Sequence, residues 1–437
     1  MQVLKFGGTS VGSADRIKHV AQLLMDGGRK LVVLSAVAGT TNALAEICRE
    51  LYNGNKESLE PSIGQLAEQY ENLISELYTE ESAKNAALEL VSNYFNNIRA
   101  FGLDMFTPFE EKAILAHGEL ISTGLLQLYL EEINTESTLI SALDFMRIDQ
   151  RNEPDEWYIK TNLSRILNQT YSKIIITQGF ICRNHFGEID NLKRGGSDYS
   201  ASIIGAAIHT DEIQIWTDID GMHNNDPRLV SNTRPIERLT FDEAAELAYF
   251  GAKILHPSSI LPARKANIPV VLKNTLDPEK KGTIISNESS GNSIKAVAAK
   301  DDITAIKIKS DRMLLAHGFL RKVFEVFERH AVAIDMITTS EVAVSLTIDT
   351  KEDISNLLEE LEIYGQVEVD TDQCIICVVG HFLQSEPGHA AKIADSLKTI
   401  PLRMISYGGS KNNVSFLIQK EDKAEALLAL NRGLFDL

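Results

Sequence analysis

The sequence predicts an α/β protein that begins as a sandwich of helices around a mostly parallel sheet and ends in smaller α+β units. Over roughly the first 285 residues, continuous apolar runs such as Leu31–Ser35 and Ile174–Gln178 alternate with helical patterns. Strands of this kind are buried on both faces, as in a parallel sheet covered by helices. Asn287–Ser293 is polar and contains glycine, so we expect a linker there.

The other elements of the first part follow the same alternation. Ile213–Thr217 and Pro269–Leu272 are further apolar runs that we expect to be strands. Ser13–Met25 and Phe241–Phe250 have the spacing of helices. Residues 55–100 differ, because they show helical spacing with almost no strand-forming residues. We therefore expect a helical hairpin inserted into the first domain.

The last third of the chain contains a weak internal repeat. Ile303–Val369 has the order β-α-β-β-α-β, which is a split ferredoxin-like unit. Asp335–Ile348 can be laid over Arg403–Ile418 at an offset of about 70 residues. We expect two copies of one small domain; chance similarity between generic strand–helix patterns is the alternative. Whether the copies are consecutive or nested stays open.

The composition excludes several classes of protein. The 437 residues are 44% hydrophobic and 24% charged, which is ordinary globular usage. There are 43 Lys and Arg against 61 Asp and Glu, a formal net charge of −18. A strongly acidic protein repels nucleic acid and anionic lipid, so we expect neither as a partner. No apolar run approaches the roughly 18 residues of a membrane span, and we expect a cytoplasmic location.

Four cysteines are too few for a disulfide framework. Cys374 and Cys377 form a C-x-x-C pattern inside what reads as a buried strand. A separation of three places them on opposite faces of that strand, so metal binding or pairing is awkward. We interpret both as packing residues.

The opening segment Lys5–Ser10 follows a short strand and precedes a helix. Its two glycines allow backbone N–H groups to approach an anion, and Lys5 adds a full charge. A tight strand–helix turn with a surface lysine is the structural alternative. Ser35–Asn42 is similar, with small residues and hydroxyls that could line a ligand or form a plain loop. In His117–Glu119, the carboxylate could bind an amine or cap a helix.

Arg194–Ser200 is more informative, with the sequence Arg-Gly-Gly-Ser-Asp-Tyr-Ser. Arginine binds carboxylates and phosphates through two parallel hydrogen bonds, and the two glycines open the backbone. Asp198 could serve this site or act only as a helix N-cap.

Three later segments have nucleotide-binding character. Trp216–Gly221 and Asn225–Arg228 follow a strand end, where nucleotides bind in open α/β sheets. Gly251–Pro257 supplies a second lysine, Lys253, whereas His256 before Pro257 is better read as a structural cap. Neither a Walker A pattern nor G-x-G-x-x-G occurs in the chain.

Taken together, these motifs resemble the aspartate kinases, because six of them occur here in that family's order. They are Lys5–Ser10, Ser35–Asn42, His117–Glu119, Arg194–Ala201, Trp216–Gly221 and Gly251–Pro257. The repeated C-terminal units resemble the ACT regulatory domains of the same enzymes, including Gly318–Leu320 and Asp335–Glu341. The sequence ends after the second copy, so it is most similar to the monofunctional, lysine-sensitive type.

The resemblance implies an amino-acid-kinase-type three-layer sandwich followed by two ferredoxin-like ACT domains. We expect a catalytic domain at 1–286, with the helical insertion at about 55–100, and ACT domains at 300–372 and 373–437. The implied reaction is transfer of phosphate from ATP to the side-chain carboxylate of L-aspartate, the first step of lysine, threonine and methionine synthesis. Mg²⁺ is implied mainly through the ATP phosphates. A carboxylate of pKa about 4 is already ionised at neutral pH, so the site needs charge neutralisation and no general base.

The resemblance also implies roles for single residues. The catalytic residues are Lys5, Asp198 and Lys253. The phosphate-binding residues are Lys5, Gly7, Gly8 and Ser10. The aspartate-binding residues are Thr41, Glu119, Arg194, Gly195, Gly196 and Ser197. The ATP-binding residues are Thr217, Asp218, His223, Arg228 and Lys253. The sequence departs from the family at Leu120 and His223, where Arg and Tyr are frequent.

An amino-acid effector site is implied in the first ACT domain, at Met313, Ala316, Gly318, Phe319, Leu320, Asp335, Ser340 and Glu341. Two acidic residues suit lysine better than threonine; ordinary strand-edge solvation is the alternative reading. The family implies a homodimer through the ACT domains and allows a tetramer. Two rival functions remain. One is a non-catalytic amino-acid sensor, and the other is a kinase of another small acid on the same fold. The sensor is disfavoured because all four of these residues are intact: Lys5, Arg194, Asp198 and Lys253.

Overall fold

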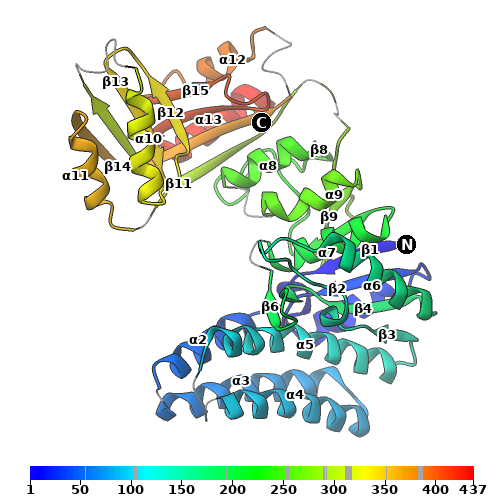
Figure 1. Cartoon of the computed structure of the whole chain (residues 1–437). Helices are drawn as coiled ribbons and strands as arrows, with labels where there is room; N and C mark the ends of the chain where they lie inside the picture. Colours follow the sequence, from blue (N-terminus) through cyan, green and yellow to red (C-terminus); the bar gives the residue numbers. More distant parts are fainter. Residues whose placement is uncertain are drawn as a thin grey trace. The chain divides into compact units, whose positions relative to one another are not determined.

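The computed structural model describes residues 1–54, 56–101, 106–192, 195–251, 255–288, 291, 293–310, 317–350, 352–381 and 387–437. The chain divides into two compact units. One comprises Met1–Gly221 and Leu255–Glu288, and the other comprises Met222–Ile254 and Ser289–Leu437. Figure 1 shows the elements of both units.

A mostly parallel sheet forms the centre of the first unit. The four predicted apolar runs are its strands β2, β4, β7 and β9, and the strands of this unit lie in the order β3, β4, β2, β1, β7, β9, β10. All neighbouring pairs are parallel except β9 with β10. The strands are β1 Gln2–Phe6, β2 Lys30–Leu34, β3 Ser137–Leu139, β4 Ile174–Gln178, β7 Ile213–Thr217, β9 Val270–Asn274 and β10 Thr283–Ser286. A hairpin of β5 (Ile181–Arg183) and β6 (Ile189–Asn191) stands apart from this sheet.

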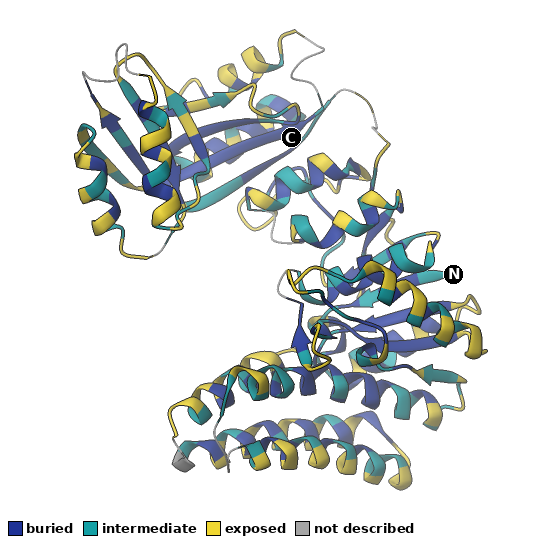
Figure 2. Ribbon diagram, viewed as in Figure 1, coloured by how far each residue is buried: buried dark blue, intermediate teal, exposed yellow. Residues whose placement is uncertain are grey.

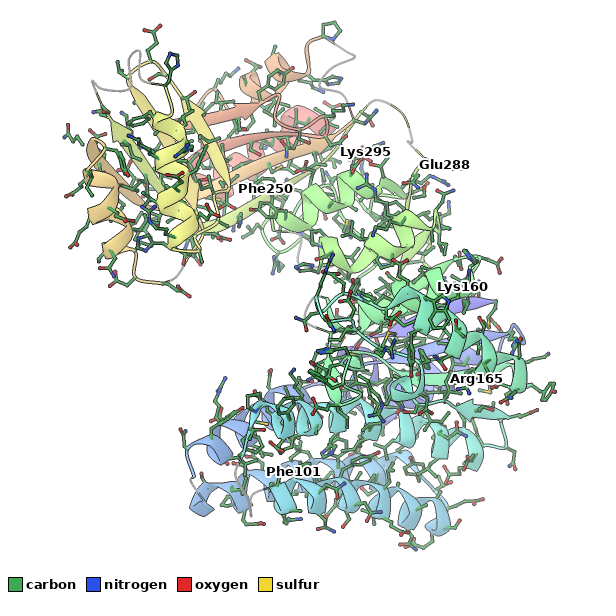
Figure 3. All side chains as sticks on the ribbon, viewed as in Figure 1. Phe101, Lys160, Arg165, Phe250, Glu288 and Lys295 are labelled. Atoms are coloured by element: carbon green, nitrogen blue, oxygen red, sulfur yellow. The ribbon has the colours of Figure 1, made fainter. Side chains whose placement is uncertain are left out.

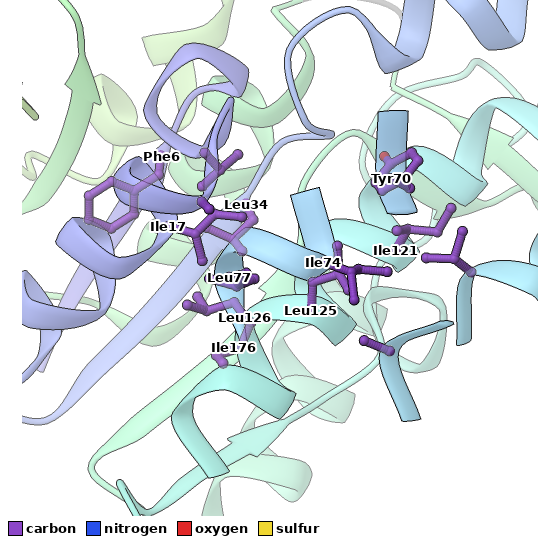
Figure 4. Close-up of a cluster of buried hydrophobic side chains, with 14 of the residues drawn as sticks. Phe6, Ile17, Leu34, Tyr70, Ile74, Leu77, Ile121, Leu125, Leu126 and Ile176 are labelled. Atoms are coloured by element: carbon purple, nitrogen blue, oxygen red, sulfur yellow. The ribbon is translucent and has the colours of Figure 1, made fainter. Parts of the chain in front are cut away.

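Helices cover both faces of this sheet. One hydrophobic cluster joins α1–α5 to β1, β2 and β4, with Phe6, Leu34 and Ile176 among its members (Figure 4). On the other face, α7 packs on β1 and β2 and contacts α6 and α9. Charged side chains such as Lys160 and Arg165 of α6 are exposed (Figure 3). The helices are α1 Ala14–Leu24, α2 Thr40–Tyr52, α3 Lys56–Leu77, α4 Glu81–Phe101, α5 Pro108–Glu132, α6 Glu156–Gln169, α7 Gly196–Ile208 and α9 Leu261–Lys265, with 3₁₀ turns at Gly8–Val11, Ala142–Asp144 and Pro257–Ile260.

The predicted helical hairpin is present as α3 and α4. Its inner face packs on α5 and its outer face is exposed (Figure 2). Helix α5 is long and apolar enough to cross a membrane by length and composition alone, but 67% of its most apolar window is buried inside the protein. A capping box of Thr107 and Glu110 begins it, as expected for the core helix of a folded domain.

The second unit contains one antiparallel sheet in the order β12, β13, β11, β14, β16, β15. Its strands are β11 Ile294–Lys309, β12 Met336–Thr339, β13 Ala343–Ile348, β14 Gln366–Gly380, β15 Met404–Tyr407 and β16 Asn413–Gln419. Helices α10 (Phe319–Arg329) and α11 (Ser355–Glu362) enclose one hydrophobic cluster with this sheet. Helices α12 (His389–Ser396) and α13 (Lys423–Phe435) enclose another. Strand β8 (Arg238–Thr240) and helix α8 (Phe241–Tyr249) also belong to this unit.

The two ferredoxin-like copies are nested. Residues 303–309 of β11 pair with residues 366–373 of β14, whereas residues 294–300 pair with residues 375–380. The second copy therefore takes its last strand from chain that precedes the first copy. The sequence placed the first strand of this region at Ile303, and the structure begins it at Ile294. The acidic pair Asp301-Asp302 hides this continuity, because it lies at an irregularity of the ladder where Asp302 has φ +59°.

All four cysteines are free and buried. Cys374 and Cys377 lie in the buried half of β14. Burial raises the pKa of the Cys374 thiol to about 12. A thiol of that pKa is neutral and unreactive at neutral pH, as the packing interpretation requires.

Candidate active site

The candidate active site lies at the carboxyl edge of the parallel sheet. Strand β1 pairs in parallel with β2 and β7, and β2 with β4, so the carboxyl ends of four strands meet at one edge. The residues at these ends are small or polar: Gly7, Ser35, Gly179 and Thr217. Ligands of open α/β sheets bind at this edge, because the loops there leave the backbone accessible.

Lys5 and Asp198 form the charged centre of this edge. Lys5 Nζ lies 2.6 Å from Asp198 Oδ1, and the two side chains are 12% and 16% exposed. Asp198 stands in the first turn of α7, which begins after Gly195 at φ +68°. The helix N-terminus stabilises the aspartate, and the aspartate in turn fixes the lysine ammonium. A Cβ at Gly7 would lie 3.4 Å from Lys5 Nζ, so the ammonium passes close over that backbone.

Ser197 connects this charge pair to two neighbouring strands. The hydroxyl of Ser35, after β2, donates to Ser197 Oγ at 2.9 Å. Gly179, after β4, approaches so closely that a Cβ there would lie 2.4 Å from Ser197 Oγ. Any side chain at Gly179 would displace Ser197, so a glycine is required to hold the serine at the site.

Glu119 is the buried carboxylate of the site. The side chain projects from α5, and Oε1 accepts a hydrogen bond from the backbone N–H of Ala36 at 3.2 Å. Oε2 is buried and has no hydrogen-bond partner. Burial raises the pKa of Glu119 to about 8. An ammonium group placed at Oε2 would satisfy it and favour the ionised form.

The glycine turn after β1 is held tightly. A Cβ at Gly8 would lie 2.8 Å from the carbonyl oxygen of Ala36, so the loops after β1 and β2 are in direct contact. The hydroxyl of Ser10, predicted to bind phosphate, shares a hydrogen bond of 2.7 Å with Thr275 Oγ1, and its N–H donates to Gly7 O. The hydroxyl and the N–H of Ser10 are thus engaged inside the protein, and so is the N–H of Gly7, which donates to Trp216 O at 3.3 Å.

Thr40 and Thr41 point in different directions at the start of α2. Thr40 Oγ1 shares a buried hydrogen bond of 2.8 Å with the hydroxyl of Tyr70, which comes from α3 of the inserted hairpin. Thr41, the predicted aspartate-binding residue, is exposed. Tyr70 therefore anchors the residue next to Thr41.

The predicted nucleotide-binding residues are divided between the two units. In the first unit, Thr217 Oγ1 donates to Asp218 Oδ1 at 3.2 Å. In the second, His223 Nδ1 lies 2.9 Å from Thr233 Oγ1. The exposed Arg228 forms two hydrogen bonds to Asp226, of 2.9 and 2.7 Å, and this pairing raises the pKa of Arg228. The predicted Arg194 and Lys253 lie outside the described residues.

The predicted effector residues lie in the second unit. Gly318, at φ +83°, begins α10, followed by the buried Phe319 and the half-buried Leu320. Asp335 is paired with Lys300 at 2.8 Å. Ser340 and Glu341 are exposed in the turn between β12 and β13. Met313 and Ala316 lie outside the described residues.

Sequence reasoning missed three residues of the first unit. Ser35 belongs to the predicted Ser35–Asn42 segment but has no role of its own there, and neither Gly179 nor Tyr70 is among the predicted site residues. Gly179 follows an apolar strand just as Gly7 does, and that signal could have found it. Tyr70 gave no signal, because an aromatic residue in an amphipathic helix reads as core.

One further titratable side chain, that of His117, stands close to Glu119 in the chain. His117 is buried beside Tyr94, and burial lowers its pKa to about 4, so it is neutral at physiological pH. In the part of the chain that the structure describes, no three His, Cys, Asp or Glu side chains form a metal-binding group.

Models of known protein families match both parts of the chain. The amino acid kinase family matches residues 1–274, and an ACT domain matches residues 376–434. Lysine-sensitive aspartokinase 3 of Escherichia coli is 34% identical over 99% of this chain and 99% of its own length. Chloroplastic aspartokinase 2 of Arabidopsis thaliana is 33% identical over 99% of this chain and 84% of its own length.

Solved structures match over the same extent. Aspartokinase III of E. coli in complex with aspartate and ADP gives a TM-score of 0.83 at 33% identity, covering 100% of both chains. The complex of that enzyme with lysine and aspartate gives 0.82 at 33% identity, covering 100% of this chain and 99% of the other. Aspartate kinase of Clostridium acetobutylicum gives 0.88 at 25% identity, covering 99% of this chain and 100% of its own.

Proposed function

The chain belongs to the aspartokinases of the amino acid kinase family, and on that premise we propose how its residues phosphorylate the side-chain carboxylate of L-aspartate with ATP. The observation that carries the proposal is the cationic group of Lys5, fixed by Asp198 at the carboxyl edge of the sheet. Around it, the glycine backbone can receive phosphate and the Glu119 carboxylate can receive an amine. The product is 4-phospho-L-aspartate.

The reaction joins two anions, so charge neutralisation is the main requirement. The substrate carboxylate is ionised at neutral pH and attacks the γ-phosphorus; the bond to the β,γ-bridging oxygen breaks, and ADP leaves. Lys5 neutralises the charge on the transferring phosphoryl group, together with Lys253, whose role is predicted from the sequence alone. Asp198 orients Lys5 and is not required to take a proton. A charge aimed in this way is commonly worth on the order of 3–4 kcal/mol of transition-state stabilisation.

Recognition of aspartate uses groups of opposite charge. Glu119 receives the α-ammonium group at its unpartnered Oε2, and Arg194 binds the α-carboxylate. Ser197 and Thr41 position the reacting carboxylate beside Lys5. A longer amino acid would carry its carboxylate past this point, so the site favours aspartate over glutamate.

ATP is held by the residues that follow β7, among them Thr217 and Asp218, together with His223, Arg228 and Lys253. Mg²⁺ bound to the ATP phosphates would supply further charge neutralisation. The cytoplasmic location expected from the sequence stays a prediction.

A coupled assay of ADP release tests the substrate assignment. We expect turnover with ATP, Mg²⁺ and L-aspartate, and at most weak turnover with L-glutamate or N-acetyl-L-glutamate. Equal or greater activity on either of the latter would redirect the assignment to another acid.

We further propose feedback inhibition by lysine through the ACT domains, with the chain acting as a homodimer through them. The acidic pair Asp335 and Glu341 suits a dibasic effector. We expect L-lysine to inhibit turnover and threonine and methionine to inhibit weakly or not at all. Inhibition by threonine alone would contradict the lysine assignment. Lysine binding without any turnover would favour the non-catalytic sensor. A monomeric mass measured by light scattering would refute the dimer.

A further inference from the structure

A cluster of polar side chains around the buried Asp335 joins the C-terminal end of α8 to the first ferredoxin-like copy. The Asp335 side chain is 1% exposed, and Oδ1 accepts hydrogen bonds from Lys300 Nζ at 2.8 Å and from the Tyr249 hydroxyl at 2.6 Å. Lys300 Nζ also lies 2.8 Å from Asp349 Oδ2 and 4.4 Å from the centre of the Tyr249 ring. One ammonium group thus holds two carboxylates and an aromatic face.

The cluster is incomplete at one atom. Asp335 Oδ2 is buried and has no hydrogen-bond partner. A buried carboxylate oxygen without a donor is unfavourable, because its hydration has been lost and not replaced. Asp335 therefore has acceptor capacity for a further ammonium group, or for one that replaces Lys300.

Lys300 also lies beside the segment that leads to the predicted ATP-binding lysine. Gly251, two residues after Tyr249, has φ +123°, and a Cβ there would lie 2.1 Å from the carbonyl oxygen of Ala299. Ala299 directly precedes Lys300 in β11. The chain that follows α8, where Phe250 is labelled in Figure 3, is therefore pressed against the strand that carries Lys300.

Helix α8 is attached to the second copy as well. Glu246 accepts hydrogen bonds from Ser410 Oγ at 2.6 Å and from Asn413 Nδ2 at 2.5 Å. Ser410 precedes β16, and Asn413 begins it. Tyr249 thus attaches the helix to the first copy, and Glu246 attaches it to the second. A change at Tyr249 therefore acts on a helix that Glu246 already holds to the second copy.

We propose that Lys300 is a resident competitor of the amino-acid effector: its ammonium group occupies Asp335 until an effector ammonium replaces it, and Tyr249 transmits the exchange to α8. The proposal rests on the proposed function for the position of the effector site. Asp335 is the carboxylate expected to bind the effector, and in the structure an internal lysine side chain is bound to it. A lysine effector would thus exchange one primary ammonium for another of the same chemistry.

Calorimetric titration of the full chain with L-lysine tests the competition without using catalysis. In Lys300→Met the dissociation constant of L-lysine should fall about tenfold or more. Asp335 is then never occupied by an internal ammonium group, and a ligand binds more tightly when the binding-competent state is fully populated. In Lys300→Arg the dissociation constant should rise, because a guanidinium pairs with a carboxylate through two hydrogen bonds. These opposite shifts keep the test decisive if the methionine variant folds poorly.

Lys307→Met is the matched control, because Lys307 lies in the same strand and faces Glu368 at 3.6 Å. Its dissociation constant should match that of the unmodified chain. Equal affinity in all four proteins, or tighter binding in Lys300→Arg, would overturn the proposal. Absence of lysine binding in the unmodified chain would overturn it too, while turnover of aspartate would still support the proposed function.

The role of Tyr249 is tested by comparing binding with inhibition. Tyr249→Phe keeps the ring beside Lys300 and removes the hydroxyl that donates to Asp335. The ratio of the inhibitory concentration of lysine to its dissociation constant should rise severalfold in this variant. The same ratio as in the unmodified chain would refute transmission through Tyr249.

Discussion

At the residue scale, burial sets the chemistry of the site more than sequence position does. Glu119 and Asp198 are both carboxylates near the sheet edge, yet one is buried without a cation and the other is paired with Lys5. The unpaired carboxylate is suited to bind an incoming ammonium group. The paired carboxylate is suited to hold a lysine in place. The two acids thus have separate roles that their side-chain type alone would not distinguish.

The raised pKa of Glu119 predicts a pH dependence of aspartate binding. Free Glu119 is protonated below about pH 8 and must lose that proton before it can pair with the ammonium of aspartate. The value of kcat/KM for aspartate should therefore rise with pH, falling about tenfold for each unit below about pH 8. The pH profile of initial rates measures this. In Glu119→Gln, the fall of kcat/KM below about pH 8 should disappear, and kcat/KM itself should drop about 100-fold. If the same pH dependence remained in this variant, it would belong to another group.

The sequence identified most of these residues but not their pairing. Lys5 and Asp198 each belong to a motif that the sequence shows. Their 2.6 Å contact, however, depends on β1 lying beside the helix that begins at Gly196. Gly179 is not predicted, because a glycine is needed there only to make room for Ser197. The β5–β6 hairpin separates the two residues along the chain, so the sequence does not show that they touch. Close approaches of this kind are tertiary properties, so no local pattern records them.

At the element scale, the inserted hairpin supports the substrate loop. Helices α3 and α4 add a hydrophobic layer on α5, which carries Glu119, and Tyr70 of α3 reaches Thr40 beside the exposed Thr41. The hairpin was predictable from its helical spacing, but its contact with the site was not. An insertion that reads as peripheral in the sequence is therefore part of the support for the aspartate-binding residues.

Tyr70→Phe tests this support with the removal of one oxygen atom. A net hydrogen bond is worth about 1 kcal/mol, so we expect the KM for aspartate to rise about fivefold. The KM for ATP and the melting temperature should change little, since the ring stays packed. Tyr94→Phe, at a tyrosine of α4 that contacts His117, is the control and should leave both KM values unchanged. Equal changes in both KM values of Tyr70→Phe would indicate a general structural role.

At the scale of the whole molecule, the alternation of buried strands and helices was enough to predict the class of each half. Continuous apolar runs fixed the parallel sheet, because only strands covered on both faces are apolar throughout. The nested arrangement of the two copies could not be predicted. It depends on a single strand from Ile294 to Lys309 that serves both copies across the acidic pair Asp301-Asp302. Two adjacent aspartates are typical of a turn, and only the strands that pair with β11 show that the strand continues through them.

Strand β11, which serves both copies, also carries two residues on which the proposed regulation depends. Strand β11 carries Lys300 beside the predicted effector carboxylate, and the preceding Ala299 supports Gly251. Under the proposal, a change in the pairing of Lys300 would be felt at Gly251, which is packed against the neighbouring Ala299.

The central claim is that a fixed ammonium group at the sheet edge drives phosphoryl transfer to aspartate. The most direct measurement traps the acyl phosphate with hydroxylamine and compares aspartyl hydroxamate formation by the unmodified chain, Lys5→Ala and the control Lys18→Ala, whose lysine binds the Glu76 carbonyl. We predict product from the unmodified chain and the control. In Lys5→Ala, with circular dichroism unchanged, kcat should fall about 100- to 1,000-fold. Full activity in a folded Lys5→Ala protein, or no hydroxamate from the unmodified chain, would contradict the account.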